Sequence, residues 1–328
     1  MQVAAAFRTS GGLLAVSDWG SPTIRVFDAR GRLVRTLGRQ GAGPGEFRLI
    51  QRLFLAHDTL IAYDGPLRRL TRYLPDGTLL GTTQVQPSTD GGPVDLVGRL
   101  SSGRWVVTTP HSPSWTHGHG VYRDTLRVGT LVPSAVGPVT WLAEAPGATF
   151  FAYMPGGDRS RWLAGMLPVS ATGVAAQLGD TIVVGDTESV DLLFFGPAGR
   201  RVGQLALPLD PPPDLRPHRR AARDAALALD QEGRNQAYLT AAAEVDGPAP
   251  RYRDLVIGTD GLLWVQLLEP RPGDSSRYLV LTPGGAVRAR VSLPPRATLL
   301  TAQPPWLLVA LRDEDDVERV GLIAWQAQ

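Results

Sequence analysis

The chain has 328 residues, among them 37 Gly and 28 Pro, and its 33 basic and 31 acidic residues leave a formal charge of only +2. So many turn-forming residues exclude a helical bundle and favour an all-β protein with short strands. The near balance of charge argues against a general attraction to polyanions, so nucleic acid is not an expected partner. Cysteine is absent, which excludes disulfides, thiolate metal sites and cysteine nucleophiles. No apolar run reaches the roughly 18 residues that predict a membrane-spanning helix.

Three short strands and a glycine-rich connector are predicted between Leu13 and Phe47. LLAVSD and TIRVFD are apolar runs that end in Asp, and RLVRTL alternates with a period of two residues. Gly, Pro or Asp turn residues separate each run from the next. This order predicts one antiparallel sheet in which neighbouring strands follow each other in the sequence.

The same unit recurs along the chain. DTLIAYD at 58–64 is echoed by DTIVVGD at 180–186. A glycine follows the third strand in four copies, at Gly31, Gly77, Gly199 and Gly285. A repeated supersecondary unit is typical of a propeller or a solenoid. With two further blade-like segments, the repeats predict a six-bladed β-propeller that spans residues 1–328 as one domain.

Each complete blade is expected to contain four strands, counted from the axis outward. The predicted strands are 2–8, 13–18, 23–28 and 32–37 in blade one; 50–56, 59–64, 69–74 and 78–84 in blade two; 94–99 and 104–109 in blade three; 174–178, 181–186, 189–195 and 201–207 in blade four; 251–257, 262–267, 277–281 and 286–293 in blade five; and 297–302, 306–311 and 317–325 in blade six. The other strands of blade three are expected between 121 and 151. Blade six lacks a fourth strand, which predicts an open edge available for oligomerisation, or else closure by 2–8 beside 317–325.

A helical insertion is predicted at about 211–245, between blades four and five. This segment is rich in Ala, Leu and Arg and contains no strand pattern. Asp214 is a candidate N-cap, and Gly233 is a candidate break between two short helices. Four arginines have spacings that place them on one helix face, which is either a solvated surface or a site for phosphate or carboxylate groups. They are Arg216, Arg219, Arg220 and Arg223.

The segments VSDWGSPTIRVFDARG and GRQGAGPGEF resemble those of NHL-repeat proteins, specifically bacterial six-bladed propellers with a GxGPGEF connector. The resemblance is specific from Leu13 to Asp76 and continues more loosely through most of the chain. It implies an exported, periplasmic or envelope-associated protein that uses one propeller face as a docking surface. Such a protein would carry a leader and one further strand ahead of Met1; a cytoplasmic location is the alternative.

The connector GAGPGEF is expected to carry the chain from the outer edge of blade one back to the axis. Pro44 would stiffen this crossing, and Phe47 would fill the core between two blades. Three glycines would adopt backbone angles that other residues avoid: Gly41, Gly43 and Gly45. No helix N-terminus or GK[ST] follows, so a phosphate-binding loop is not favoured. Arg39 and Glu46, at either end of the connector, are candidate ligand-binding residues.

The histidines offer the strongest candidate for a metal site. His111, His117 and His119 lie in HSPSWTHGHG, a connector between the second and third strands of blade three. His117 and His119 flank one glycine, so a strand-like HxH would point both rings one way and could hold zinc or another divalent cation. The sequence places no further acid beside them to complete a ligand set. The alternative is an exposed polar loop, in which Trp115 is a candidate for ligand contact.

Acidic residues recur at the ends of strands. Asp18, Asp64 and Asp186 could form a ring of carboxylates, but Asp at a strand exit usually accepts backbone N–H groups of the following turn. The acidic run at 313–316 could hold calcium, although it lacks the glycine and glutamate of a calcium loop. Its alternative is a soluble hairpin tip, protected by charge from edge pairing.

The long loops of a propeller are expected to share one face. Loops between second and third strands lie on the same face as the loops between blades, and long loops on a rigid scaffold are where binding usually resides. The leading hypothesis is a non-catalytic scaffold that binds a ligand, a peptide or a partner protein on this loop face, without a cofactor. Its candidate residues are Arg39, Glu46, His111, Trp115, His117, His119, Arg219 and Arg220.

Two other functions remain open. One is a metal-dependent hydrolase or lyase similar to the lactonase propellers, in which Glu, Asn and Asp hold an axial cation. The chain has a single Asn, Asn235, and cannot reproduce that ligand set. The other is an RNA-binding NHL domain, which requires a basic face with aromatic residues; only the arginines of the insertion favour it.

Overall fold

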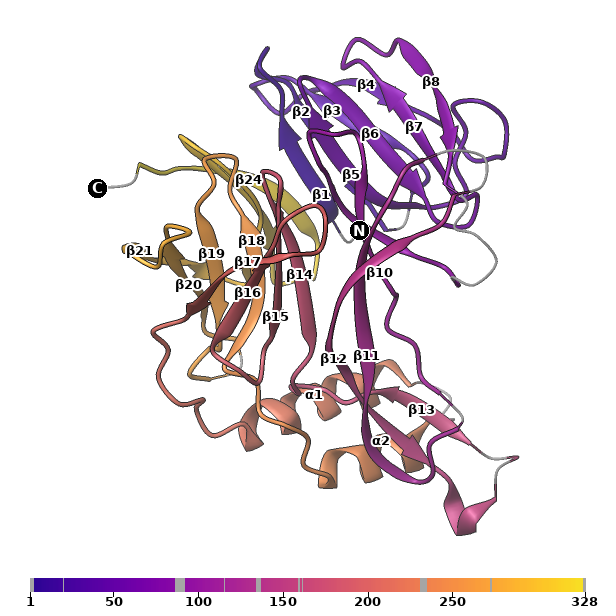
Figure 1. The fold of residues 1–328 in the computed structure, drawn as a ribbon, viewed down its shortest axis with the longest axis vertical. Coiled ribbons are helices and arrows are strands. Elements are labelled where there is room, and N and C mark those ends of the chain that lie inside the picture. Colours follow the sequence, from indigo (N-terminus) through magenta and orange to yellow (C-terminus); the bar gives the residue numbers. More distant parts are fainter. Residues whose placement is uncertain are drawn as a thin grey trace.

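The computed structural model describes residues 3–19, 21–85, 92–114, 116–133, 137–158, 160, 162–230, 235–271 and 273–326. Within these residues, six antiparallel sheets are arranged around an axis (Figure 1). The predicted six-bladed β-propeller is therefore confirmed. The helical insertion between blades four and five is confirmed as well, and it contains α1 (Arg216–Leu229) and α2 (Gln236–Glu244). A short 3₁₀ turn covers Pro155–Gly157.

The strands of each blade follow one another outward from the axis, except that blade three has a fifth strand. Blade one has β1 (Val3–Arg8), β2 (Leu14–Asp18), β3 (Ile24–Phe27) and β4 (Leu33–Leu37); blade two has β5 (Ile50–Ala56), β6 (Thr59–Asp64), β7 (Arg69–Tyr73) and β8 (Leu79–Gln84); blade three has β9 (Asp95–Arg99), β10 (Trp105–Thr108), β11 (Gly120–Leu131), β12 (Thr140–Tyr153) and β13 (Leu163–Met166). Blade four has β14 (Gly173–Leu178), β15 (Thr181–Asp186), β16 (Asp191–Phe195) and β17 (Arg201–Ala206); blade five has β18 (Tyr252–Ile257), β19 (Leu263–Leu267), β20 (Ser275–Leu281) and β21 (Val287–Pro295); blade six has β22 (Ala297–Gln303), β23 (Trp306–Arg312) and β24 (Glu318–Ala324).

The repeated glycines form the turns between the third and fourth strands of four blades. Gly31, Gly77, Gly199 and Gly285 have φ values of 74°, 96°, 81° and 90°. This left-handed conformation carries a steric cost for residues with a Cβ atom, which explains why glycine recurs at the position. In each turn the glycine N–H donates to the carbonyl three residues earlier, at 2.9 to 3.0 Å. The local sequence thus fixes the outer hairpin of these blades.

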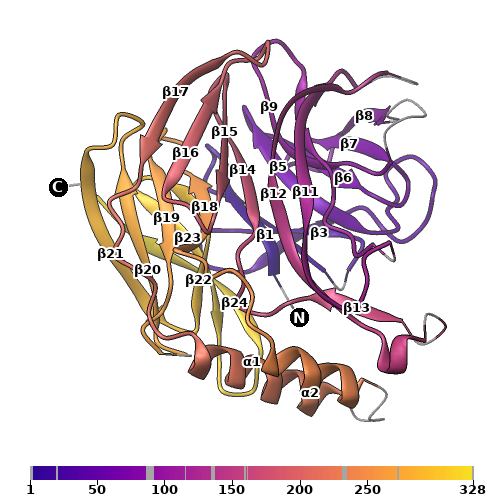
Figure 2. The same cartoon turned by 60° about the horizontal axis from the view of Figure 1, so that its bottom comes forward.

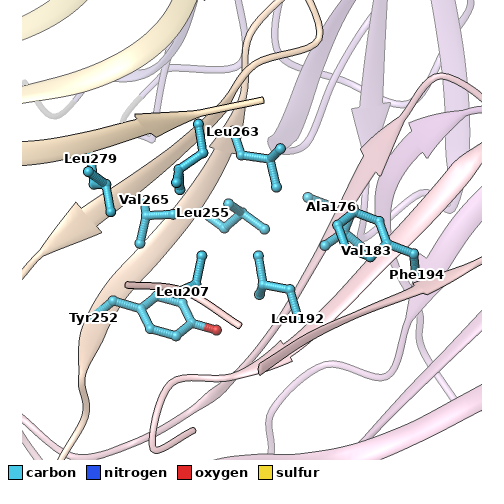
Figure 3. Packing of buried hydrophobic residues seen from close by; sticks show 11 residues of the cluster. Ala176, Val183, Leu192, Phe194, Leu207, Tyr252, Leu255, Leu263, Val265 and Leu279 are labelled. Carbon is cyan, nitrogen blue, oxygen red and sulfur yellow. The ribbon is translucent and has the colours of Figure 1, made fainter. Parts of the chain in front are cut away.

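Apolar side chains between adjacent blades form the core. Figure 3 shows one such cluster, in which residues of blade four face residues of blade five. Val183 and Leu192 come from blade four, and Leu255 and Val265 come from blade five. Tyr252 joins them with no exposed surface. Removing apolar surface of this kind from water contributes about 25 cal/mol per Å² to stability, so packing between the blades holds the ring together.

Blade three departs furthest from the repeat. The strands β11 and β12 contain 12 and 14 residues and form a long hairpin whose open end projects beyond the ring. The strand β13, which the sequence analysis did not predict, pairs with this projecting part of β12. Phe151 of β12 packs with Leu167 and with Ala242 of α2. In Figures 1 and 2 the helices lie at the same end of the molecule as β13, so hairpin, strand and helices form one extension.

Blade six contains three strands among the described residues, as the sequence predicted. The strand β1 pairs with β2, so the alternative pairing of 2–8 beside 317–325 is not found. Hydrogen bonds from blade six to β1 close the ring instead. The Thr301 hydroxyl donates to the Ala6 carbonyl at 2.8 Å, and the Gln303 amide binds both backbone groups of Arg8. The outer edge of β24 therefore has no neighbouring strand within the described chain.

Neither helix of the described chain combines the length and the apolar character that crossing a membrane would require.

Candidate functional site

The glycine-rich connector is held by its own residues and by blade two. The guanidinium of Arg69, which is 7% exposed, donates to the carbonyls of Ala42 at 2.7 Å, Gly43 at 2.8 Å and Glu46. The Glu46 carboxylate accepts the N–H of Gly43 at 2.7 Å and binds the Arg39 guanidinium at 2.8 Å. The hydrogen bonds and the Arg39 pair lower the pKa of Glu46. The candidates Arg39 and Glu46 are thus brought together, but as an ion pair that closes the connector.

Phe47 fills the core between blades one and two, as predicted. Its side chain has no exposed surface and packs in one cluster with residues of both blades. Gly45 has a φ of 73°, and a Cβ atom there would lie 2.7 Å from the Tyr73 hydroxyl. The prediction for Gly43 was wrong, because its φ is not positive. A side chain at Gly43 would instead be crowded by the Glu46 carboxylate, which lies 3.0 Å from the position of a Cβ atom.

The three histidines do not converge. Nδ1 of His111 lies 3.2 Å from the Asp124 carboxylate and also 3.2 Å from the Ala148 N–H. The His117 ring stacks on Tyr122, with ring centroids 4.0 Å apart, and Tyr122 stacks on Phe150. The rings of His111 and His117 therefore have different partners and do not point to a common site.

His119 contacts the other side of the hairpin. Its ring meets Phe151 edge to face at 5.5 Å. Phe150 and Phe151 are consecutive in β12, so they point to opposite faces of the sheet. His117 and His119 therefore lie on opposite faces, and the predicted HxH arrangement was wrong because this segment forms a turn and not a strand. Trp115, the other candidate in this loop, lies outside the described residues.

No group of three or more His, Asp or Glu side chains is arranged to hold a metal ion in the part of the chain that the structure describes. The only Asn of the sequence, Asn235, precedes α2 within the insertion. In the acidic run, Asp313 accepts the N–H groups of Asp315 and Val317 at 3.1 and 2.9 Å. This geometry is the hairpin turn that the sequence analysis gave as the alternative to a calcium loop.

The strand-end aspartates bind different partners. Asp64 accepts the N–H groups of Arg48 and Leu67 at 2.7 and 3.0 Å. Asp18 forms an ion pair with Arg25. Asp186 receives both arms of the Arg123 guanidinium at 2.8 and 2.9 Å. Asp64 and Asp186 accept N–H groups of the following turn, from Leu67 and Glu188, as predicted, whereas the contact of Asp18 is with Arg25.

Arg123 joins the blade three extension to blade four. Besides Asp186, it binds Glu188 at 3.1 Å and the carbonyl of Gly147 at 2.8 Å. The side chains of Arg123 and Asp186 are each 17% exposed. Charged hydrogen bonds in a fork geometry are stronger than neutral ones and fix the orientation of both partners.

The arginines of the insertion are largely paired with acids. Arg219 binds Asp246 and donates to the Gly247 carbonyl at 3.1 Å. Arg216 pairs with Asp214, whose carboxylate also accepts the Arg216 N–H at 3.0 Å. These contacts lower the pKa of Asp214 to about 2. The predicted N-cap at Asp214 was wrong by one residue, because α1 has Leu215 as its N-cap. Arg220 is exposed, and it does not lie with the histidines in one site.

A cavity of about 590 Å³ lies on the axis of the ring. All six innermost strands contribute to its wall. The side chains of Ala5, Phe54, Val97 and Val256 make much of this wall apolar. Its volume falls in the range of roughly 300–1,000 Å³ that is typical of small-molecule sites.

Arg52 and Arg99 line this cavity, and an acidic residue, Asp254, lies opposite Arg52 on an innermost strand. Arg52 lies on β5 of blade two and Asp254 on β18 of blade five, three blades away around the ring. Asp254 and Val256 share one face of β18, as Arg52 and Phe54 share one face of β5, because side chains alternate along a strand. Both residues are exposed.

A β-bulge places both residues at the same level. In blade two the pairing passes from Ile50↔Asp64 to Arg52↔Tyr63, and in blade five it passes from Tyr252↔Leu267 to Asp254↔Gln266. Blade one has the same bulge, and Ala5 is the corresponding residue. Ala5, Arg52 and Asp254 thus form one layer near the loop face, where the innermost strands begin.

Neither charge has a strong partner within the described chain. The described residues form no ion pair with Arg52 or Asp254, and the Asp254 carboxylate accepts the N–H of Leu255 at 2.8 Å. Burial raises the pKa of Asp254, while the Arg52 charge across the channel lowers it by a smaller amount. The sequence analysis missed both residues. The available signal was a charged residue where the aligned inner strand of blade one has Ala.

A second cavity of about 490 Å³ lies between blades two and three. His57, Arg72 and Arg99 line it together with Trp105. Arg99 and Trp105 also line the axial cavity, so the two cavities adjoin.

Comparisons with known proteins agree with this architecture. Residues 5–90 match a family described as a 6-bladed beta-propeller. A solved Bacteroides fragilis protein described as exported is 12% identical, with a TM-score of 0.51 over 95% of this chain and 80% of that one. A Bacteroides vulgatus protein of another family is 10% identical, with a TM-score of 0.47 over 98% and 94%. A streptogramin B lyase is 11% identical, with a TM-score of 0.44 over 99% and 84%. No curated protein matches in sequence. At these identities the similarity is one of fold.

Proposed function

We propose that this protein is a binding scaffold that takes a small polar molecule into the axial channel from the loop face. The observation that carries the proposal is a pair of opposite charges on innermost strands: Arg52, which lines the cavity, and Asp254, which lies two residues before the lining residue Val256. Neither has an ion-pair partner in the described chain. Small-molecule sites are concave, mostly apolar and equipped with a few polar groups that fix orientation. The axial channel has this composition.

The loop face supports this choice by contrast. Several of its candidate residues are engaged with one another or with the backbone, as in Arg39 with Glu46 and His111 with Asp124. Groups that already satisfy each other offer little to a ligand, because binding would have to break the existing contacts. We therefore infer that the loop face forms the entrance of the channel and stabilises the structure around it.

The test fills the channel. Ala5→Trp adds an indole ring at the level of Arg52 and Asp254, while Ala286→Trp adds the same ring on an exposed turn between β20 and β21. Both variants and the wild type are screened by thermal shift against amino acids, sugars, small carboxylic acids and small amines. A ligand at about 100 times its Kd stabilises the folded state by about 2.7 kcal/mol.

We expect at least one compound to raise the Tm of the wild type and of Ala286→Trp but not that of Ala5→Trp. A compound that shifts all three equally binds elsewhere. If every active compound behaves in that way, or if none is active, the axial site is refuted.

We also propose that the protein is exported, because its connector resembles those of exported NHL-repeat propellers. Fractionation of the source cells would test it: the protein should appear outside the cytoplasm, and recovery with cytoplasmic proteins would contradict export.

A further inference from the structure

We propose that the axial channel binds a small zwitterion, with the carboxylate of the ligand on Arg52 and its ammonium group on Asp254. This inference rests on the proposed function and adds the chemical class of the ligand. The class comprises amino acids and other short molecules that carry one positive and one negative group.

The positions of the two residues support a ligand that bridges them. Arg52 and Asp254 lie on opposite blades and in the same layer, because each follows a bulge at the start of its innermost strand. They do not form an ion pair with each other, yet the charge of Arg52 affects the titration of Asp254. They lie three blades apart around the ring, so a ligand in the channel could contact both.

The signs of the charges select the class. A simple anion would pair with Arg52 and be repelled by the negative charge of Asp254. A simple cation would pair with Asp254 and be repelled by the positive charge of Arg52. A neutral molecule would displace water from both charges without replacing it, which is unfavourable. Within this layer, a zwitterion provides an opposite charge for each side chain; Arg99, which also lines the cavity, lies outside the layer at the last residue of β9.

The surrounding wall suits the rest of such a molecule. Ala5 and Phe7 of β1 and Val256 of β18 present apolar surface beside the charged layer. Methylene groups between the two charged ends would contact these side chains and leave water. The guanidinium can bind a carboxylate with two parallel hydrogen bonds, which fixes the direction of the ligand along the pair.

Isothermal titration calorimetry tests the class with a series of defined spacing. Glycine, β-alanine and γ-aminobutyrate are the zwitterions, and propionate and propylamine are the matched molecules with one charge. We expect at least one zwitterion to bind the wild type at least about tenfold more tightly than either singly charged molecule, because charged hydrogen bonds at both ends contribute.

Variants then assign the two ends. Arg52→Met and Asp254→Asn should each weaken zwitterion binding at least about tenfold. Exchange of the charges, in the double variant Arg52→Asp with Asp254→Arg, should restore binding with the ligand reversed. Arg72→Met is the matched control, because Arg72 is an exposed arginine of blade two that lines the second cavity and not the axial one.

The outcomes separate this inference from the proposed function. If no zwitterion binds, or if propionate binds as tightly as the best zwitterion, the class is wrong. The channel itself survives that result if another compound binds the wild type and not Ala5→Trp. If a zwitterion binds Ala5→Trp as tightly as the wild type, it lies elsewhere and both claims fail. Circular dichroism of each variant excludes unfolding as the cause of a loss.

Discussion

The loop face and the axial channel contain the same kinds of charged residue in different circumstances. On the loop face Arg123 is bound by Asp186 and Glu188, and Arg219 is bound by Asp246. In the channel Arg52 and Asp254 face each other without forming such a pair in the described chain. The comparison indicates that residue type and clustering are weak signs of a binding site. What distinguishes the channel is that Arg52 and Asp254 have no ion-pair partner among the described residues.

The energetic reason lies in desolvation. A charge that is removed from water regains the lost free energy only through its partners, and the loop-face arginines have those partners. A charge at the channel that is partly removed from water gains a strong partner only when a ligand binds. The loop face therefore contributes to stability, and the channel remains available for binding. Changes at the two places should separate these effects.

The largest expected effect is on packing beneath the loop face. Phe47→Ala removes a fully buried ring between blades one and two. We expect the free energy of unfolding to fall by about 3–5 kcal/mol, because the transfer free energy is lost and a cavity remains. Denaturation in guanidinium chloride measures this change. Phe27→Ala, which removes a partly buried ring of the same blade, is the control and should cost less. Equal costs would contradict the proposed role of Phe47.

A smaller effect is expected at the contact between the extension and blade four. Arg123→Met breaks the fork with Asp186 and leaves the Gly147 carbonyl without this donor. We expect a loss of about 1–3 kcal/mol in the free energy of unfolding. Arg32→Met removes the exposed pair with Asp28 and should change stability little. Ligand binding in the channel should persist in both variants. Loss of binding in folded Arg123→Met would show that the two regions are not separate.

The fold was predictable where local sequence decides the backbone. Gly31 and its three equivalents fix the outer hairpins because their turns require a positive φ. The bounds of β5 and β6 agree with the prediction because apolar alternation and turn residues mark both ends. In contrast, β13 has four residues and depends on pairing with β12, and Tyr238 of α2 packs beside it. That arrangement depends on contacts between distant segments.

The site was harder to predict for the same reason. Whether Arg52 faces the axis depends on the bulge after Ile50, and a shift of one residue moves a side chain to the other face of its strand. The sequence analysis instead chose clusters of polar residues, such as the histidines. It could not show that His111 is held by Asp124 or that His117 stacks on Tyr122.

The dependence of stability on pH gives a subtler difference between the two regions. Burial raises the pKa of Asp254 above its ordinary value of 3.8, so folding favours the protonated carboxyl. Stability from this group is fully present below pH 3.8 and is lost as the pH rises through the folded pKa. Asp254→Asn removes this loss. The variant should gain stability relative to the wild type as the pH rises above 3.8, and the difference should then level off.

Thermal unfolding across this pH range measures the difference, which is expected to be modest because channel water solvates the carboxylate. The loop-face acid Glu46 provides the control, since its pKa is lowered. Its contribution to stability is present above its ordinary value of 4.5 and is lost as the pH falls through the folded pKa. Glu46→Gln should therefore lose stability relative to the wild type toward neutral pH, opposite in sign to Asp254→Asn. The same sign for both variants would contradict the contrast between a paired and an unpaired carboxylate.

The smallest effect is expected from metal removal. The three histidines contact different partners, and His117 and His119 lie on opposite faces of the β11–β12 hairpin. A divalent ion would need all its ligands within about 2.0–2.2 Å, so the hairpin would have to be rebuilt to bring the rings together. We therefore expect EDTA to leave the Tm of the wild type unchanged. The variant with all three histidines replaced by Ala is the control, because it cannot lose a metal bound there. A fall in Tm with EDTA that occurs in the wild type and is absent from the variant would show that the loop binds a metal after all, and that clustering of residue type had been the better guide on this face.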